Sequence, residues 1–309
     1  MTPVESLEPV GGLPFVVVDV FTTGGSFTGN QLAVVLGTDD LPTAALQALA
    51  RQFNLSETAF PQRPTVPGAD YRLRIFTPFD ELPFAGHPSV GAAWVLRQLG
   101  AVPGTGTLRQ ECGAGVVELA VGDPEGPVRL TGATPTVTEV ADPADLLAAS
   151  GVPGAALTAP ALRCGTGLGW TVLAVDEAAV ERAVPDLGRL RARLAAGLDG
   201  DVAVVAREDG SDGRAFDLHV RAFAGVAGVE DPATGSLALA LGAFAVAAGW
   251  AAPEGVTRYR VRQGAEVGRP SLLDGEVTAR GGRAERVRVA GTVHPTATGR
   301  IRVPAAAGR

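Results

Sequence analysis

The alternation of apolar and polar positions divides the first sixty residues into short strands and one helix. Phe15–Phe21 (FVVVDVF) and Asn30–Leu36 (NQLAVVL) are rich in β-forming residues, and the glycine-rich stretch between them predicts a hairpin. Leu41–Phe53 has apolar residues at helical spacing, which predicts an amphipathic helix with Asn54 as its C-cap. Ser56–Pro61 (SETAFP) is typical of a further strand.

The stretch Arg74–Leu96 (RIFTPFDELPFAGHPSVGAAWVL) combines a strand end, a polar loop and an apolar helix. Prolines and glycines interrupt any regular pattern after residue 77, and small apolar residues dominate from Ser89 onward. A helix with almost no polar face is surrounded by protein. The loop carries His87, and the free N–H groups of a helix start attract anions, so this arrangement is typical of a binding site.

The same arrangement occurs a second time. Sliding the chain against itself by 147 residues places Arg74 on Arg221 and, without a gap, Ser89 on Ser236. The second loop, GVEDPATG, leads into SLALALGAFAVAAG, a helix that is apolar all round. The repeat predicts two similar halves, each with a buried helix entered through a polar loop.

Strands dominate the rest of the chain. Gly122–Pro127 is a polar, turn-forming stretch that marks a boundary, and the glycine-rich Cys164–Gly169 favours a tight turn over an anion cradle because no helix follows it. Four late strands lie between residues 258 and 303, and a loop between the first two carries Arg269, which has either a structural role or a ligand contact. The pattern indicates a sheet wrapped around a central helix, twice.

The overall composition is that of a globular protein. The 309 residues are 46% hydrophobic and 19% charged, enough for one large domain or two of ordinary size. Leu237–Ala252 is too short to span a bilayer and indicates a core helix. The N-terminus lacks the pattern of a signal peptide, and Cys112 and Cys164 lie far apart outside any CxxC motif, so we expect a cytoplasmic protein with no membrane partner.

The charged residues exclude several kinds of chemistry. All 26 basic residues are arginine, which excludes lysine Schiff bases and phosphate-loop lysines. A net charge of −7 without a basic cluster argues against nucleic-acid binding. Three histidines and two scattered cysteines do not form a zinc set, and no GxGxxG follows a strand. We therefore expect no cofactor and no metal, and catalysis by carboxylates, His87, hydroxyls, backbone dipoles or the cysteines.

Five ordered motifs together resemble the phenazine-biosynthesis PhzF-like proteins, from Val18 to about Val303: FTGNQLAVV, NLSETAF, ELPFAGHPSVGAA, EDPATGS and QGAEVGRPS. The resemblance implies an α+β protein of the diaminopimelate epimerase-like fold. Its two pseudo-symmetric domains are each a curved, barrel-like, mostly antiparallel sheet around a central apolar helix. The domains would span 1–127, with a returning C-terminal strand at 298–309, and 128–297. The family also implies a possible homodimer and a cleft site between the domains.

The resemblance also implies the site residues. Glu57 of NLSET would be the catalytic acid/base, and His87 and Asp231 would complete the catalytic set. Without the resemblance, Glu57 would be interpreted as a solvated carboxylate, His87 as a helix cap, and Asp231 as a charge at a helix start. Ser236 is open to two interpretations, an N-cap or a substrate ligand. The expected substrate-binding residues are Asn30, Gly86, Ser89, Gly235 and Ser236.

The chain departs from the family pattern at three places. Gln31 replaces the usual proline of the first motif, and GHPS replaces GHPT. Related racemases carry two cysteines just before the two central helices, at positions that we assign here to Ala85 and Pro232. A two-thiol racemase is therefore disfavoured.

Three functions remain open at this point. The first is a cofactor-independent isomerase of the trans-2,3-dihydro-3-hydroxyanthranilate isomerase type. It would move a proton on a small carboxylate-bearing, dihydroaromatic or amino-acid-derived metabolite, as in phenazine or similar secondary metabolism. The second is an amino-acid epimerase or racemase. The third is a non-catalytic small-molecule-binding protein, which a fully exposed and unbonded Glu57 would favour.

Overall fold

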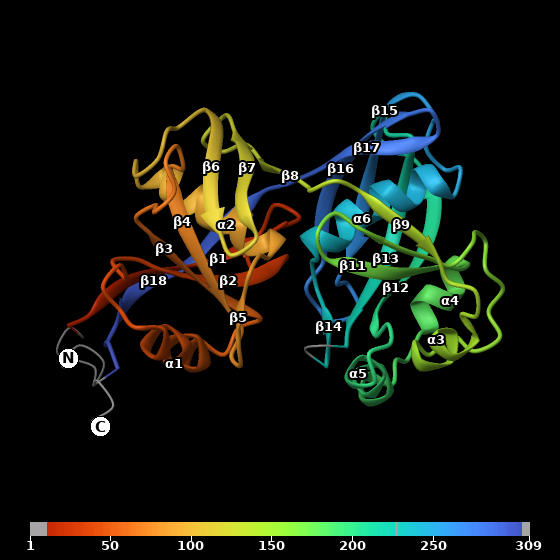
Figure 1. Ribbon diagram of the computed structural model, residues 1–309, viewed down its shortest axis with the longest axis horizontal. Helices are drawn as coiled ribbons and strands as arrows, with labels where there is room; N and C mark the ends of the chain where they lie inside the picture. The colour runs from red at the N-terminus through yellow and green to blue at the C-terminus, as the bar shows by residue number, and fades with distance from the viewer. Residues whose placement is uncertain (1–10, 226–227, 305–309) are drawn as a thin grey trace.

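A computed structural model describes residues 11–225 and 228–304 of the chain and shows two lobes side by side (Figure 1). Parts of two predictions, the first ten residues of the N-terminal domain and residues 305–309 of the returning strand, lie outside the described residues. No helix of the described part is long and apolar enough to cross a membrane.

The first lobe is built from nine early elements, and a tenth, β8, begins the connection to the second lobe. In chain order they are β1 (Leu13–Val20), β2 (Asn30–Val35), α1 (Thr43–Phe53), β3 (Glu57–Gln62), β4 (Tyr71–Phe76), β5 (Glu81–Leu82), α2 (Gly86–Gln98), β6 (Gly106–Cys112), β7 (Gly115–Val121) and β8 (Val128–Thr131).

The remaining elements build the second lobe and return to the first. They are β9 (Thr136–Glu139), α3 (Ala144–Ala149), β10 (Leu162–Gly165), β11 (Gly169–Ala174), α4 (Glu177–Arg182), α5 (Leu187–Ala195), β12 (Asp201–Asp209), β13 (Phe216–Ala224), β14 (Val229–Asp231), α6 (Gly235–Ala247), β15 (Gly255–Gln263), β16 (Ser271–Arg280), β17 (Arg283–Gly291) and β18 (Val293–Ile301).

The strand pairing of the first half recurs in the second. In the first half β2 pairs in parallel with β3, β3 is antiparallel to β4, and β4 is antiparallel to β5 and parallel to β6. In the second half β11, β12, β13, β14 and β15 follow the same scheme. The predicted α+β class, with a large curved, unclosed sheet and few helices, is confirmed.

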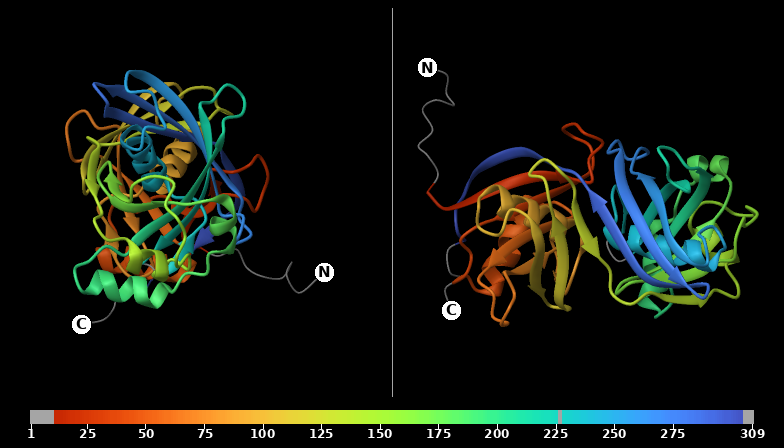
Figure 2. Two further views of the ribbon diagram at one scale, coloured as in Figure 1. Left: turned by 90° about the vertical axis from the view of Figure 1, so that its right-hand side faces the viewer. Right: turned by 90° about the horizontal axis from the view of Figure 1, so that it is seen from above.

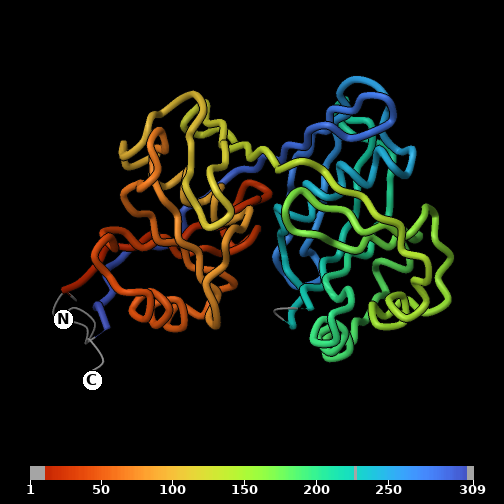
Figure 3. The backbone as a smooth tube through the Cα atoms, viewed as in Figure 1, coloured from red at the N-terminus to blue at the C-terminus, as the bar shows by residue number. Residues whose placement is uncertain are grey.

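Two connections join the lobes. Strand β8 pairs with both β7 and β17, and β18 runs back from the second lobe to pair antiparallel with β1 (Figures 2 and 3). The returning strand, which we expected to begin at residue 298, begins at Val293 and ends at Ile301.

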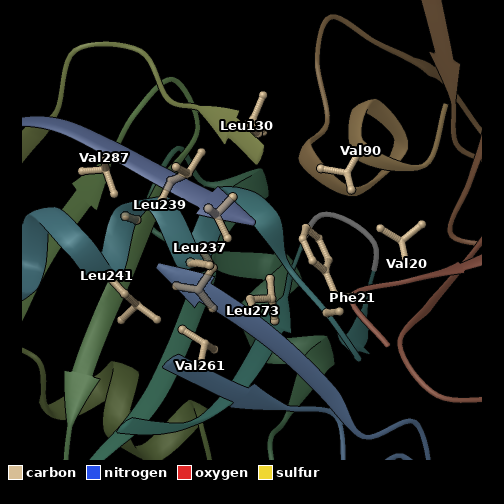
Figure 4. Close-up of a cluster of buried hydrophobic side chains, with 14 of the residues drawn as sticks. Val20, Phe21, Val90, Leu130, Leu237, Leu239, Leu241, Val261, Leu273 and Val287 are labelled. Atoms are coloured by element: carbon tan, nitrogen blue, oxygen red, sulfur yellow. The ribbon is translucent and has the colours of Figure 1, made fainter. Parts of the chain in front are cut away.

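Helices α2 and α6 form the centres of the two halves, as their apolar sequences predict. Every residue of α2 from Gly86 to Arg97 is buried, and so is every residue of α6 from Gly235 to Val246. The small residues are needed for this packing, because a Cβ on Gly91 would come within 2.6 Å of the Leu32 Cδ2 atom. Figure 4 shows Phe21 between Val20 and Val90 of the first half and the α6 side chains of the second.

The offset between equivalent residues of the two halves is larger in the central helices than in the strands that precede them. In the first half Arg74 pairs with Glu81, and in the second Arg221 pairs with Glu230. The arginines are 147 residues apart and the glutamates 149, because the second loop is two residues longer. The ungapped match of Ser89 with Ser236 is therefore wrong, and the true counterpart of Ser236 is His87, since each is the second residue of its helix.

Candidate active site

The first residues of α2 and α6 abut at the junction of the two halves. A Cβ atom on Gly86 would lie 3.1 Å from the Gly235 Cα, and one on Gly235 would lie 3.3 Å from the Gly86 Cα. A side chain at either position would push the two helix starts apart by a few tenths of an ångström, so glycine allows the closest approach. The free N–H groups and positive dipole ends of both helices therefore lie together, an arrangement that favours an anion such as a substrate carboxylate.

Glu57 and His87 face one another beside these helix starts. Glu57 begins β3, and His87 lies in the first turn of α2 and not in the preceding loop, because the helix starts three residues earlier than predicted. The Glu57 Oε2 atom is 3.4 Å from the His87 Nδ1 atom. Among the described residues neither Glu57 Oε2 nor His87 Nε2 has a hydrogen-bond partner, although both atoms are buried. Buried polar atoms of this kind call for an explanation, and a bound substrate supplies one.

Asp231, at the end of β14, is held by hydrogen bonds from both halves. Asn30 donates its side-chain amide to Oδ1 at 2.7 Å, and the Thr234 hydroxyl donates to Oδ2 at 2.6 Å. Asn30 also donates to the backbone oxygen of Ala233 at 3.2 Å. The predicted residues Asn30 and Asp231 are thus brought together across the junction.

The surroundings give the three titratable groups different protonation states. Burial, with a smaller contribution from the Asp231 charge, raises the pKa of Glu57 to about 8. Burial also raises the pKa of Asp231 to about 6, although hydrogen bonds from Thr234, Ala233 and Asn30 oppose the shift. Burial lowers the pKa of His87 to about 3. At neutral pH the site therefore holds a protonated Glu57, an ionised Asp231 and a neutral His87, and two carboxyl groups with separated pKa values are typical of acid/base catalysis.

The two predicted serines make hydrogen bonds within the protein. Ser89 donates to the Ala85 oxygen at 2.8 Å and accepts from Gln110 at 2.9 Å. Ser236 accepts from the Trp170 indole at 3.1 Å. The N-cap interpretation of Ser236 is wrong, because Thr234 is the N-cap residue of α6 and Ser236 lies inside the helix.

The residues before the two helices contain no thiol. The N-cap positions are Ala85 and Thr234, so the assignment of the second position to Pro232 is wrong by two residues. Both cysteines are buried elsewhere, Cys112 at the end of β6 and Cys164 in β10. Burial raises the pKa of Cys164 to about 12, so it is a poor nucleophile at neutral pH.

The structure places two segments whose roles the sequence left open. Cys164–Gly169 forms the tight turn between β10 and β11. Arg269 donates to the Gly29 oxygen and pairs with Asp19, so its guanidinium is engaged within the protein. No group of three or more His, Cys, Asp or Glu side chains in the described part is arranged to hold a metal ion.

Sequence reasoning missed the role of Thr234. Its position three residues after Asp231, inside EDPATGS, was an available signal, because a hydroxyl at that spacing can bond back to a carboxylate at a helix start. Gln263 was also missed, although it is the first residue of the motif QGAEVGRPS, because nothing in that motif indicates a contact with the loop before α6.

Comparison with known proteins is consistent with the resemblance noted in the sequence. The family described as phenazine biosynthesis-like protein (PhzC-PhzF) matches residues 18–299. The trans-2,3-dihydro-3-hydroxyanthranilate isomerase of Pseudomonas aeruginosa is 35% identical over 93% of this chain and 98% of its own length. Two solved structures each align with 94% of this chain, and 99% of each solved chain is included in the alignment. The first is a PhzF-family protein of Bacillus anthracis, with 22% sequence identity and a TM-score of 0.83. The second is a predicted epimerase of P. aeruginosa, with 31% sequence identity and a TM-score of 0.75.

Proposed function

The chain belongs to the phenazine biosynthesis-like (PhzC-PhzF) family, and we propose that it is a cofactor-independent isomerase that uses Glu57 to move a proton between two carbon atoms of a small carboxylate-bearing metabolite. The observation that carries the proposal is the Glu57–His87 contact beside the abutting starts of α2 and α6. A protonated acid, a neutral imidazole and an anion site meet there.

Glu57 is suited to both halves of a proton shift. With its pKa near 8, it donates its proton to one carbon of an electron-rich double bond at neutral pH. Protonation of that carbon leaves the positive charge on the second carbon of the double bond. The carboxylate formed then removes a proton from the carbon on the other side of this cationic centre, the double bond moves by one position, and Glu57 is again protonated. One C–H bond forms and one breaks, so no oxidant, reductant or cofactor is needed.

The other groups hold the substrate during this exchange. The substrate carboxylate would lie at the two helix starts, where the backbone N–H groups of Gly86 and Gly235 lack intrahelical partners. Neutral His87, whose Nε2 has no partner among the described residues, would bond a substrate polar group and orient Glu57. Ionised Asp231 would accept a hydrogen bond from a substrate amino or hydroxyl group and stabilise the positive charge that develops on protonation.

These contacts support a substrate of the class that gives the P. aeruginosa relative its name, a partly unsaturated cyclic amino acid with a hydroxyl group. Its carboxylate, amine and ring double bonds match the anion site, the carboxylate acceptor and the proton donor. A non-catalytic binding role is disfavoured, since the Glu57 side chain is only 18% exposed and faces His87.

The test is hydrogen exchange at carbon. The protein is incubated with trans-2,3-dihydro-3-hydroxyanthranilate in D₂O, and the products are followed by NMR. We expect deuterium at one ring carbon together with migration of a double bond. Glu57→Gln should lower the rate by about 10²–10⁴-fold, the usual contribution of one positioned acid/base. Glu118→Gln, which changes an exposed carboxylate of β7, is the matched control. Near-normal turnover by Glu57→Gln would overturn the proposal.

A further inference from the structure

The loop from Gln263 to Ser271, which we call the bracket loop, contacts the Asp231 environment at both of its ends. At its first end the Gln263 amide nitrogen donates to the Asp231 backbone oxygen at 2.6 Å and to the Thr234 Oγ1 atom at 2.9 Å. Because Thr234 Oγ1 accepts from Gln263, its own proton is free to point to Asp231 Oδ2, 2.6 Å away. Gln263 thus fixes the direction of one of the two side-chain hydrogen bonds to Asp231.

The second end of the bracket loop acts through Gly29. The Arg269 Nε donates to the Gly29 oxygen at 2.9 Å, and the Gly29 N–H donates to the Pro270 oxygen at 3.0 Å. Both backbone polar groups of Gly29 are therefore held by consecutive residues of the loop. The next residue, Asn30, donates the other side-chain hydrogen bond to Asp231.

A buried ion pair anchors this end to the opposite half of the molecule. The Arg269 Nη2 atom lies 2.5 Å from Oδ1 of Asp19, a β1 residue with no exposed surface. The second Asp19 oxygen accepts from the Phe27 N–H at 2.8 Å. A desolvated pair with its remaining lone pairs satisfied is geometrically well defined, and losing one partner leaves an uncompensated buried charge.

From these contacts we propose that Gln263 and Arg269 are positioning residues, through which the bracket loop holds both carboxylate oxygens of Asp231 as hydrogen-bond acceptors. This rests on the proposed function, in which Asp231 acts as an anion. The hydrogen bonds from Asn30 and Thr234 lower the pKa of Asp231 against the effect of burial. Loosening either end should therefore raise that pKa. Glu57, whose pKa the Asp231 charge helps to raise, makes no hydrogen bond with the described residues of the bracket loop.

The first experiment measures the Asp231 carboxyl directly by NMR titration of ¹³C-labelled protein, with Asp231→Asn for assignment. Wild-type protein should titrate near pH 6. Gln263→Met, which keeps the side-chain volume and removes the amide, should titrate about one unit higher, since a pKa reports the difference in interaction between the two protonation states. Arg260→Met is the control, because Arg260 pairs with Asp274 on the same β-hairpin, away from the bracket loop contacts. An unchanged pKa in Gln263→Met would overturn the proposal for Gln263.

For Arg269, the double variant Arg269→Met/Asp19→Asn separates positioning from charge neutralisation. It also removes the buried Asp19 charge that Arg269→Met alone would leave unpaired, so it avoids the main cost to folding of the single variant. We expect its Asp231 pKa to be raised as in Gln263→Met, and kcat to fall about 10–100-fold, since small misplacements of a catalytic group have effects of this size. KM should change less than about threefold. Arg269→Lys keeps the positive charge and loses the planar guanidinium with its several N–H donors. Its Asp231 pKa and its kcat should lie between those of wild type and the double variant.

The opposite result is equally clear. If the double variant has the wild-type titration and kcat, Arg269 serves only to neutralise Asp19, and the proposal is wrong for that residue. The titration uses no substrate, so it stays informative if the proposed reaction is refuted by the Glu57→Gln exchange experiment.

Discussion

Replacement of Glu57 by glutamine should stabilise the fold by an amount that grows with pH. Glutamine keeps the shape of the side chain and cannot ionise. The folded-state pKa of Glu57 is about 8 against an ordinary value of 4.5. Between these values the unfolded chain loses its proton while the folded protein keeps it, so wild-type stability falls as pH rises through this window. Above pH 8 Glu57 is ionised in both the folded and the unfolded protein, so wild-type stability falls no further from this group.

The magnitude follows from the width of the window. At about 1.36 kcal/mol per pH unit, the advantage of Glu57→Gln relative to pH 4 is about 3 kcal/mol at pH 7 and up to about 5 kcal/mol above pH 8. The assay is urea unfolding followed by the fluorescence of the three tryptophans at pH 5, 7 and 9, with Glu118→Gln as the control. Parallel stability curves for wild type and Glu57→Gln between pH 5 and 9 would refute the reasoning that burial keeps Glu57 protonated.

Two further predictions test the protonation states and the helix junction. The rate of the proposed exchange should rise as Asp231 ionises near pH 6 and fall as Glu57 loses its proton near pH 8, and a flat pH–rate profile from 5 to 9 would contradict the assignment. Gly86→Ala places a Cβ 3.1 Å from the Gly235 Cα, so it should separate the helix starts and lower kcat/KM about 100-fold with little loss of stability. Gly91→Ala is the control, because its Cβ would lie 2.6 Å from the Leu32 Cδ2 atom within the first half. It should destabilise the fold by about 1–3 kcal/mol without a specific loss of turnover. Equal effects of the two variants on turnover would contradict this distinction.

Much of the architecture could be predicted from the sequence, because the two apolar helices and their polar entrances leave strong local patterns. The register of the repeat could not. The second loop is two residues longer, and runs of alanine, glycine and leucine in α6 match α2 at several offsets, so the ungapped match hid the equivalence of His87 and Ser236. Only the pairing of the flanking strands and the two arginine–glutamate bridges reveal it.

The site could be predicted only in part, for a similar reason. Motifs identified Glu57 and Asp231, but the protonation states depend on burial and on partners that are distant in sequence. Asn30 bonds Asp231 across 201 positions, and Arg269 meets Asp19 across 250. Contacts of this range leave no periodicity in one sequence, so the sequence alone does not indicate the partners of Arg269.

The symmetry of the frame and the asymmetry of its chemistry together favour isomerisation over epimerisation. Strand register makes Asp201 the counterpart of Glu57, and Leu82 the counterpart of Asp231. The two carboxylates of the site therefore occupy non-equivalent positions, and each is in a different state. Epimerisation needs a base on one face of a carbon and an acid on the other. Asp231 is poorly suited to the second role, because both its oxygens already accept hydrogen bonds, from Asn30 and from the N-cap threonine of α6. In the proposed reaction, Glu57 alone would deliver a proton to one carbon and remove a proton from another on the same face of the substrate, and a double-bond shift requires no second acid or base.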